Sequence, residues 1–195
     1  MTPLDKLSRR EMLAALGLLP LLSASAAVPV SEVRKRGNTL VAYFSRTGNT
    51  RVIAGQIHRA LGTDLFEIQP AAPYPEDYEE TVEQARRERD RGYEPPLRAR
   101  VSEIGAYEIV FLGFPIWGET APPVIRSFLT EHDLSGKTVM PFITHGGYGL
   151  GSSLALLRAH APRARLVEGL TMQADQERQT LTSVTRWLGD VRARK

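Results

Sequence analysis

The sequence contains no cysteine among its 195 residues. This absence excludes a disulfide-stapled scaffold, a thiolate zinc or iron–sulfur site, a cysteine nucleophile and a lipid-modified cysteine anchor. A strong charge imbalance is also missing, because 25 basic residues face 22 acidic ones and the net charge is only +3. Such a balance gives weak support to nucleic-acid binding, and we predict no nucleic-acid partner.

Long apolar runs are missing as well. The apolar stretch at residues 12–22 is much shorter than the roughly 20 residues that a membrane-spanning helix needs. It follows the pair Arg9-Arg10 and precedes Ala24-Ser25-Ala26, an order typical of an export signal. An amphipathic helix belonging to the fold is the alternative. We predict a twin-arginine signal peptide at 1–27, a lead segment at 28–37, and a periplasmic or otherwise exported protein without a stable membrane anchor after cleavage.

The rest of the chain alternates between two kinds of segment. Hydrophobic residues make up 42% and charged residues 24%, the balance of a globular protein. Short apolar segments predict strands at 39–45, 64–69, 108–113, 138–144 and 164–172, the last interrupted at Gly169. Apolar residues at helical spacing predict helices at 50–61, 78–91, 123–131, 152–160 and 176–191. We therefore predict one α/β domain at 38–192, a doubly wound five-stranded parallel sheet with helices on both faces.

Ligands of such sheets bind beyond the carboxyl ends of the strands, so the loops there are the candidate site. The loop after the first strand carries hydroxyl and amide side chains around one glycine and runs into a helix N-terminus, which favours a single phosphate group. It is neither a Walker A nor a dinucleotide-binding glycine motif. An ordinary helix cap formed by Asn49 or Thr50 is the alternative. The candidate residues are Ser45, Arg46, Thr47, Gly48, Asn49 and Thr50.

The loop after the third strand holds a tryptophan among turn-forming residues. An aromatic side chain on a rigid loop can serve as a platform for a flat ligand, although it can also fold back onto the sheet edge. The candidates here are Pro115, Ile116, Trp117 and Gly118. The loop after the fourth strand is rich in glycine, so its backbone can approach a ligand closely unless the loop is merely flexible. Its candidates are Thr144, His145, Gly146, Gly147 and Tyr148.

Four motifs in this order resemble the flavodoxin-like family, and most closely its small bacterial branch. They are YFSRTGNT at 43–50, YPEDYEETVEQA at 74–85, GFPIWGETAPPVIRSFL at 113–129 and THGGYGLGSS at 144–153. The resemblance implies a three-layer sandwich with strand order 2-1-3-4-5 that binds flavin mononucleotide (FMN). It further implies that the first loop holds the phosphate with Arg46 nearby, that the Trp117 loop lines the isoalloxazine, and that residues 144–148 offer backbone donors to its pyrimidine edge.

Three functions stay open at this point. The first is electron transfer through FMN to an unidentified redox partner protein, and the second is FMN-dependent reduction of a quinone or other small acceptor. The third is a non-enzymatic module that has kept the fold and lost the flavin. The charge-dense helix at 78–91 is expected to face solvent, or to dock a redox partner. No two histidines share metal-ligand spacing, so we predict no metal site.

Overall fold

The computed structural model describes residues 37–173 and 177–193. For residues 177–181 it describes the backbone alone. The predicted signal peptide, 1–27, and the lead segment up to residue 36 lie outside these residues. The helices and strands are β1 (Thr39–Tyr43), α1 (Asn49–Leu61), β2 (Asp64–Glu67), α2 (Tyr78–Asp90), the short 3-10 helix η1 (Ile104–Ala106), β3 (Ile109–Pro115), α3 (Pro123–Glu131), β4 (Thr138–His145), α4 (Ser153–His160), β5 (Arg165–Leu166), β6 (Leu170–Gln173) and α5 (Glu177–Ala193). In the described part of the chain, no helix is long and apolar enough to cross a membrane.

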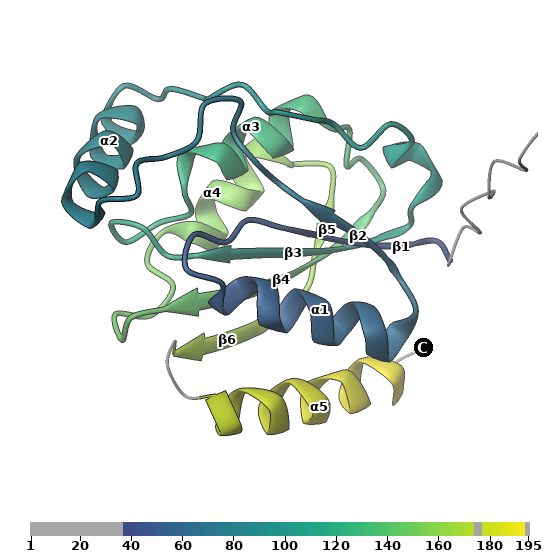
Figure 1. Cartoon of the computed structure of the whole chain (residues 1–195). Coiled ribbons are helices and arrows are strands. Elements are labelled where there is room, and N and C mark those ends of the chain that lie inside the picture. Colours follow the sequence, from purple (N-terminus) through teal and green to yellow (C-terminus); the bar gives the residue numbers. More distant parts are fainter. Residues whose placement is uncertain (1–36, 174–176, 194–195) are drawn as a thin grey trace, which may run out of the picture. The chain divides into compact units, whose positions relative to one another are not determined.

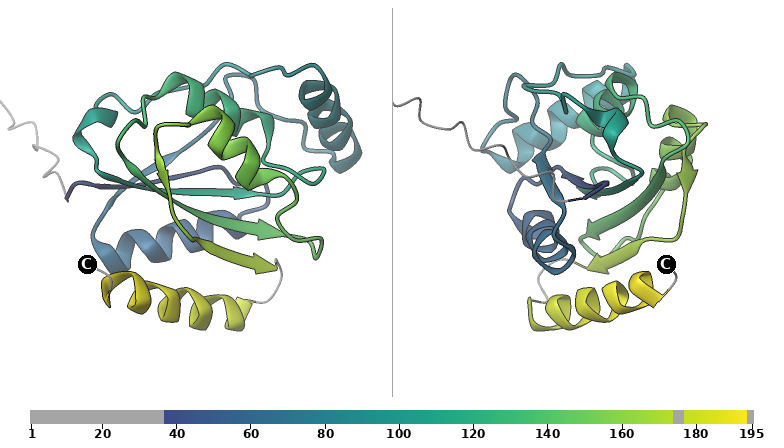
Figure 2. Two further views of the ribbon diagram at one scale, coloured as in Figure 1. Left: turned by 180° about the vertical axis from the view of Figure 1, so that it is seen from behind. Right: turned by 90° about the vertical axis from the view of Figure 1, so that its right-hand side faces the viewer.

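All strands pair in parallel in the order β2-β1-β3-β4-β5, with β6 also on β4. The predicted order 2-1-3-4-5 is therefore confirmed, with two short strands in the fifth position. Figures 1 and 2 show α1 and α5 on one face of the sheet and α3 and α4 on the other. Successive side chains of β1 point to opposite faces of the sheet. Leu40 and Ala42 pack in the core under α3, while Val41 and Tyr43 pack in the core under α1.

The interruption of the last strand has a visible cause in β4. Val139 pairs with Leu166 and Phe142 pairs with Leu170, so four steps along β5–β6 match three along β4. This one-residue bulge lies opposite Pro141, which has no N–H to donate to the neighbouring strand. Gly169 fills the bulge, where an added Cβ would lie 1.8 Å from the carbonyl oxygen of Pro141.

A second glycine makes room in the middle of the sheet. Gly113 of β3 pairs with Phe142 of β4, whose ring is fully buried. A Cβ at Gly113 would lie 2.0 Å from that ring, so any larger residue must displace it.

Gly113→Ala is therefore expected to lower the free energy of unfolding by about 1–3 kcal/mol, the usual cost of overpacking a core. Denaturant unfolding of the variant and the parent measures the change. Gly105→Ala is the control, because an added Cβ there has no neighbour within 4 Å. Equal stability of Gly113→Ala and the parent would show that Phe142 can move without cost.

His132, directly after α3, is buried and holds two backbone groups. Its Nε2 accepts a hydrogen bond from Val101 N at 3.0 Å, and its Nδ1 lies 2.8 Å from the carbonyl oxygen of Phe128. An acceptor at Nε2 and a donor at Nδ1 describe a neutral ring. Burial lowers the pKa of His132 below its ordinary value of 6.5.

Because the folded state binds this proton less readily than the unfolded chain, folding stability is expected to fall as the pH drops below 6.5. The loss should level off once the pH is below the depressed pKa of the folded state. Urea unfolding between about pH 8 and 5 measures it, and His132→Gln should give a flatter profile because no imidazole titrates at this position. Parallel profiles would show that other groups cause the acid sensitivity.

Candidate functional site

The three predicted loops meet at one edge of the sheet. Strands β3, β4 and β6 point toward this edge, and α2 stands beyond it in Figure 1 and in the left view of Figure 2. A cavity of about 390 Å³ opens there, within the usual size range of small-molecule sites. From the first loop it is lined by Ser45, Arg46, Thr47, Asn49 and Thr50. From the other two it is lined by Pro115, Ile116, Trp117, Gly118, Thr144, His145 and Gly146.

The first loop ends in a helix N-terminus that no side chain of the described residues caps. Helix α1 begins at Asn49 after the N-cap Gly48, whose φ of 98° lies in the left-handed region that favours glycine. Gly48 N donates to Ser45 Oγ at 3.1 Å, which closes the loop. Neither the alternative cap Asn49 nor Thr50 caps the helix, and its first turn has no acidic residue. The remaining N–H groups and the helix dipole are therefore available for an anion.

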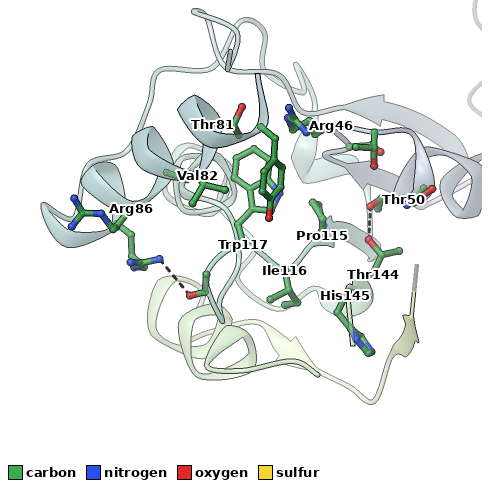
Figure 3. Close-up of a pocket in the computed structure, with 18 residues that line it drawn as sticks. Arg46, Thr50, Thr81, Val82, Arg86, Pro115, Ile116, Trp117, Thr144 and His145 are labelled. Atoms are coloured by element: carbon green, nitrogen blue, oxygen red, sulfur yellow. Dashed lines mark hydrogen bonds between the residues drawn. The ribbon is translucent and has the colours of Figure 1, made fainter. Parts of the chain in front are cut away.

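Thr50 ties the first loop to the third. Its side chain is 1% exposed, and its Oγ1 lies 2.9 Å from Thr144 Oγ1 across 94 positions of sequence (Figure 3). A hydroxyl has one donor and two acceptor sites, so this pair leaves Thr50 further capacity. Its predicted phosphate contact stays a prediction.

Arg46 reaches across to the start of α2. Its Nη2 donates to the carbonyl oxygen of Glu76 at 2.6 Å, and its guanidinium lies 5.8 Å from the ring centroid of Tyr78. The contact with the ring is a cation–π interaction. Arg46 lines the cavity beside the helix N-terminus, so its charge adds to the attraction for an anion.

The second loop is a tight turn that fixes Trp117. Trp117 and Thr120 exchange backbone hydrogen bonds of 2.9 and 3.3 Å, and Gly118 and Glu119 between them have φ of 54° and 64°. Two positive φ values describe a type I′ turn.

Trp117 packs on neighbouring segments and also lines the cavity, and its role as a platform for a flat ligand stays a prediction. Its ring packs edge-to-face on Phe44 and Tyr74, with centroid distances of 5.2 and 4.9 Å, so it does fold back onto neighbouring segments. The side chain is only half-buried, and it also lines the cavity, where Figure 3 places it beside Pro115 and Ile116. The protein thus holds this aromatic surface in place before any ligand arrives.

The third loop is shaped by His145. Its Nδ1 accepts hydrogen bonds from the backbone N–H groups of Gly147 at 3.0 Å and Gly149 at 3.4 Å. Gly147 and Tyr148 do not line the cavity, and neither does Gly48 of the first loop. Tyr148 is 91% exposed. The structure therefore brings twelve of the fifteen predicted residues together and leaves these three at the margin.

The chain matches a known protein family over most of its length. Residues 38–191 match the family model described as flavodoxin. The chain belongs to the flavodoxin family.

Solved structures agree with this assignment. A protein from Bacteroides eggerthii, assigned as a flavoprotein, is 35% identical with a TM-score of 0.67, over 77% of this chain and 95% of that one. A second, from Bacteroides uniformis, is 30% identical with a TM-score of 0.68, over 77% and 99%. A Lactobacillus acidophilus flavoprotein solved with FMN is 19% identical with a TM-score of 0.60, over 74% and 97%, and shares the fold. No curated protein matches the chain.

The sequence analysis did not predict that helix α2 forms one wall of the cavity. The predicted solvent-facing helix, α2, lines the cavity with Tyr78, Thr81, Val82, Ala85, Arg86 and Arg89. These positions recur every three or four residues and so share one helix face, which is the signal that could have found them. The expectation of a helix surrounded by solvent was wrong for this face, although Tyr78 and Val82 stay 69% and 48% exposed.

The start of α2 is held firmly in place. Asp77 caps it, with Oδ1 accepting from Glu80 N at 2.9 Å, and Thr81 Oγ1 donates to the carbonyl oxygen of Pro75 at 2.7 Å. Deeper in the helix, Glu88 is 8% exposed and accepts a 2.8 Å hydrogen bond from Tyr74 Oη. Burial, followed by the nearby Glu88 carboxylate, raises the pKa of Tyr74 far above its ordinary value. Tyr74 therefore stays a neutral donor, and it anchors α2 next to Trp117.

The charges that line the cavity have one sign. Arg46, Arg86 and Arg89 lie on its walls, and no aspartate or glutamate of the described residues does. A site with this composition attracts anions and favours negative charge in whatever it binds.

Proposed function

We propose that this protein binds FMN non-covalently and transfers electrons through it. One observation carries the proposal: the uncapped N-terminus of α1 opens into the same cavity as Trp117. FMN needs both features, because a phosphate group suits the free N–H groups and a flat ring suits the aromatic wall. Two solved structures with this fold, from Lactobacillus acidophilus and Fusobacterium nucleatum, hold FMN, which supports the choice of cofactor.

The residues present fit the cofactor part by part. Ser45, Thr47 and the first turn of α1 would hold the phosphate, with Arg46 adding positive charge. Trp117 and Ile116 would cover the isoalloxazine. Bound FMN supplies the redox chemistry, and the chain's own residues bind it, orient it and exclude water.

Electron transfer to an unidentified partner protein is the function this site supports best. Such a carrier needs no acid–base pair, and no carboxylate of the described residues lines the cavity. The second candidate is reduction of a quinone or other small acceptor, which His145 favours. Because Nδ1 of His145 accepts two backbone N–H groups, the proton of its neutral ring sits on Nε2, and this N–H of a cavity-lining residue can donate a hydrogen bond to a small acceptor.

Flavin titration of the apoprotein tests the proposal. FMN should bind about 100-fold more tightly than riboflavin, because riboflavin lacks the phosphate that meets the helix N-terminus and each charge-assisted hydrogen bond contributes about 1.5–3 kcal/mol. Equal affinity for FMN and riboflavin would refute the proposal that the N-terminus of α1 binds the phosphate. If the protein binds neither flavin, it is a non-enzymatic module that has kept the fold and lost the cofactor. Fast oxidation of NADPH by the FMN-loaded protein would select the reductase over the carrier.

We further propose that the mature protein works outside the cytoplasm. The pair Arg9-Arg10 and the short apolar stretch after it support export of a folded protein. Cell fractionation tests this, with Arg9→Lys and Arg10→Lys together as the variant. A wild-type chain that stays in the cytoplasm would overturn the proposal.

A further inference from the structure

Arg89 places a positive charge beside the turn that carries Trp117. It projects from the last turn of α2, and its side chain is 34% exposed. Its Nη1 lies 3.4 Å from the carbonyl oxygen of Gly118, to which it donates. A Cβ added at Gly118 would lie 2.2 Å from the same nitrogen, so the guanidinium packs directly against that turn.

The neighbouring arginines are more fully compensated or lie elsewhere. Arg86 also lines the cavity, but it makes two hydrogen bonds to Glu83, of 3.0 and 2.9 Å. Arg87 does not line the cavity and has Glu83 at 3.6 Å.

Of the carboxylates in the described part of the chain, Asp90 alone lies within 4.0 Å of Arg89, at 3.3 Å, and it lies 3.5 Å from Arg86 as well. Of the two α2 arginines on the cavity wall, Arg89 therefore carries the less neutralised charge. Arg46, the third, lies at the first loop and serves the phosphate end.

We propose that Arg89 sets the redox potential of the bound flavin by stabilising its reduced form. This inference rests on the proposed function, because it needs FMN with its ring at the Trp117 turn. Reduction adds electrons to the ring, and a nearby cation lowers the energy of the electron-rich state more than that of the oxidised one. Arg89 thus raises the midpoint potential. Its charge is partly exposed and partly screened, so the effect is moderate.

The midpoint potential of four variants, measured by equilibration with dyes of known potential, tests the proposal. Arg89→Gln removes the charge and should lower the potential, raising the dissociation constant of reduced FMN relative to oxidised FMN about three- to tenfold. Arg89→Lys keeps the charge and should stay close to the parent. Arg87→Gln is the matched control on the outer face of the same helix and should not move the potential.

Asp90→Asn provides a test of opposite sign. It removes the carboxylate next to Arg89 and should raise the potential. Because it acts without altering Arg89 itself, it also keeps the proposal testable if Arg89→Gln folds poorly. The difference between Arg89→Gln and the parent should shrink at high salt, as expected for a partly exposed charge.

Three results would overturn the inference while leaving FMN binding intact. They are equal potentials in Arg89→Gln and Arg87→Gln, a shift in Arg89→Lys as large as in Arg89→Gln, and no rise in Asp90→Asn. Failure of the parent protein to bind FMN is a different outcome, since it would refute the proposed function itself.

Discussion

Replacing Asn49 by Asp is expected to weaken FMN binding by about 3 kcal/mol, or roughly 100-fold. The change exchanges one amide nitrogen for a charged oxygen at the first residue of α1, which lines the cavity. Two unit charges about 4 Å apart near a protein surface interact by about 4 kcal/mol, and the phosphate of FMN carries nearly two. Repulsion at this position therefore outweighs the helix dipole's attraction for the phosphate.

The same substitution should leave the apoprotein intact. A carboxylate in the first turn of a helix is stabilising by about 0.3–1 kcal/mol, and α1 has no acidic residue there at present. We thus expect Asn49→Asp to lower the FMN affinity measured by fluorescence titration. The melting temperature of the apoprotein should stay unchanged or rise. Gln56→Glu makes the same chemical change farther along α1, outside the cavity, and should leave FMN affinity unchanged. Full affinity in Asn49→Asp would place the phosphate elsewhere.

The sequence is most informative where local pattern and long-range structure agree. Buried parallel strands are short apolar runs, so the order of elements and the sheet could be predicted from residues such as those at 108–113 and 138–144. Because parallel strands end at one edge, the loops after three of them could be combined into one site before any contact was known. Gly48 illustrates the success, since the one glycine of the first loop has a φ of 98°, a conformation that favours glycine, directly before α1.

The wall formed by α2 could not be predicted in the same way. Its inward face consists of threonine, alanine, arginine and partly exposed apolar residues, a composition that also fits a solvated helix. Hydrogen bonds from Arg46 to Glu76, from Tyr74 to Glu88 and from Arg89 to Gly118 hold it at the cavity, and these contacts join residues 14 to 30 positions apart in sequence. The burial of His132 could not be predicted for a similar reason, because nothing near it in sequence shows that Val101 supplies its partner.

The second large effect is expected for Trp117→Ala. Loss of a half-buried indole that contacts Phe44 and Tyr74 should lower the free energy of unfolding by about 2 kcal/mol, less than the 3–5 kcal/mol of a fully buried ring. It should also weaken FMN binding about tenfold or more, because the ring platform disappears from the cavity wall. Trp117→Phe keeps an aromatic face and should retain most of the affinity.

Stability and binding can be separated with a neighbour in the same aromatic cluster. Phe44 is 6% exposed and packs on Trp117, but it does not line the cavity. Phe44→Leu should therefore destabilise the fold while changing FMN affinity little. If Trp117→Ala and Phe44→Leu both lower stability and neither alters the dissociation constant, Trp117 is only a packing residue. If Trp117→Ala alone weakens binding, the ring acts on the flavin directly, because loss of packing in the cluster is common to both variants.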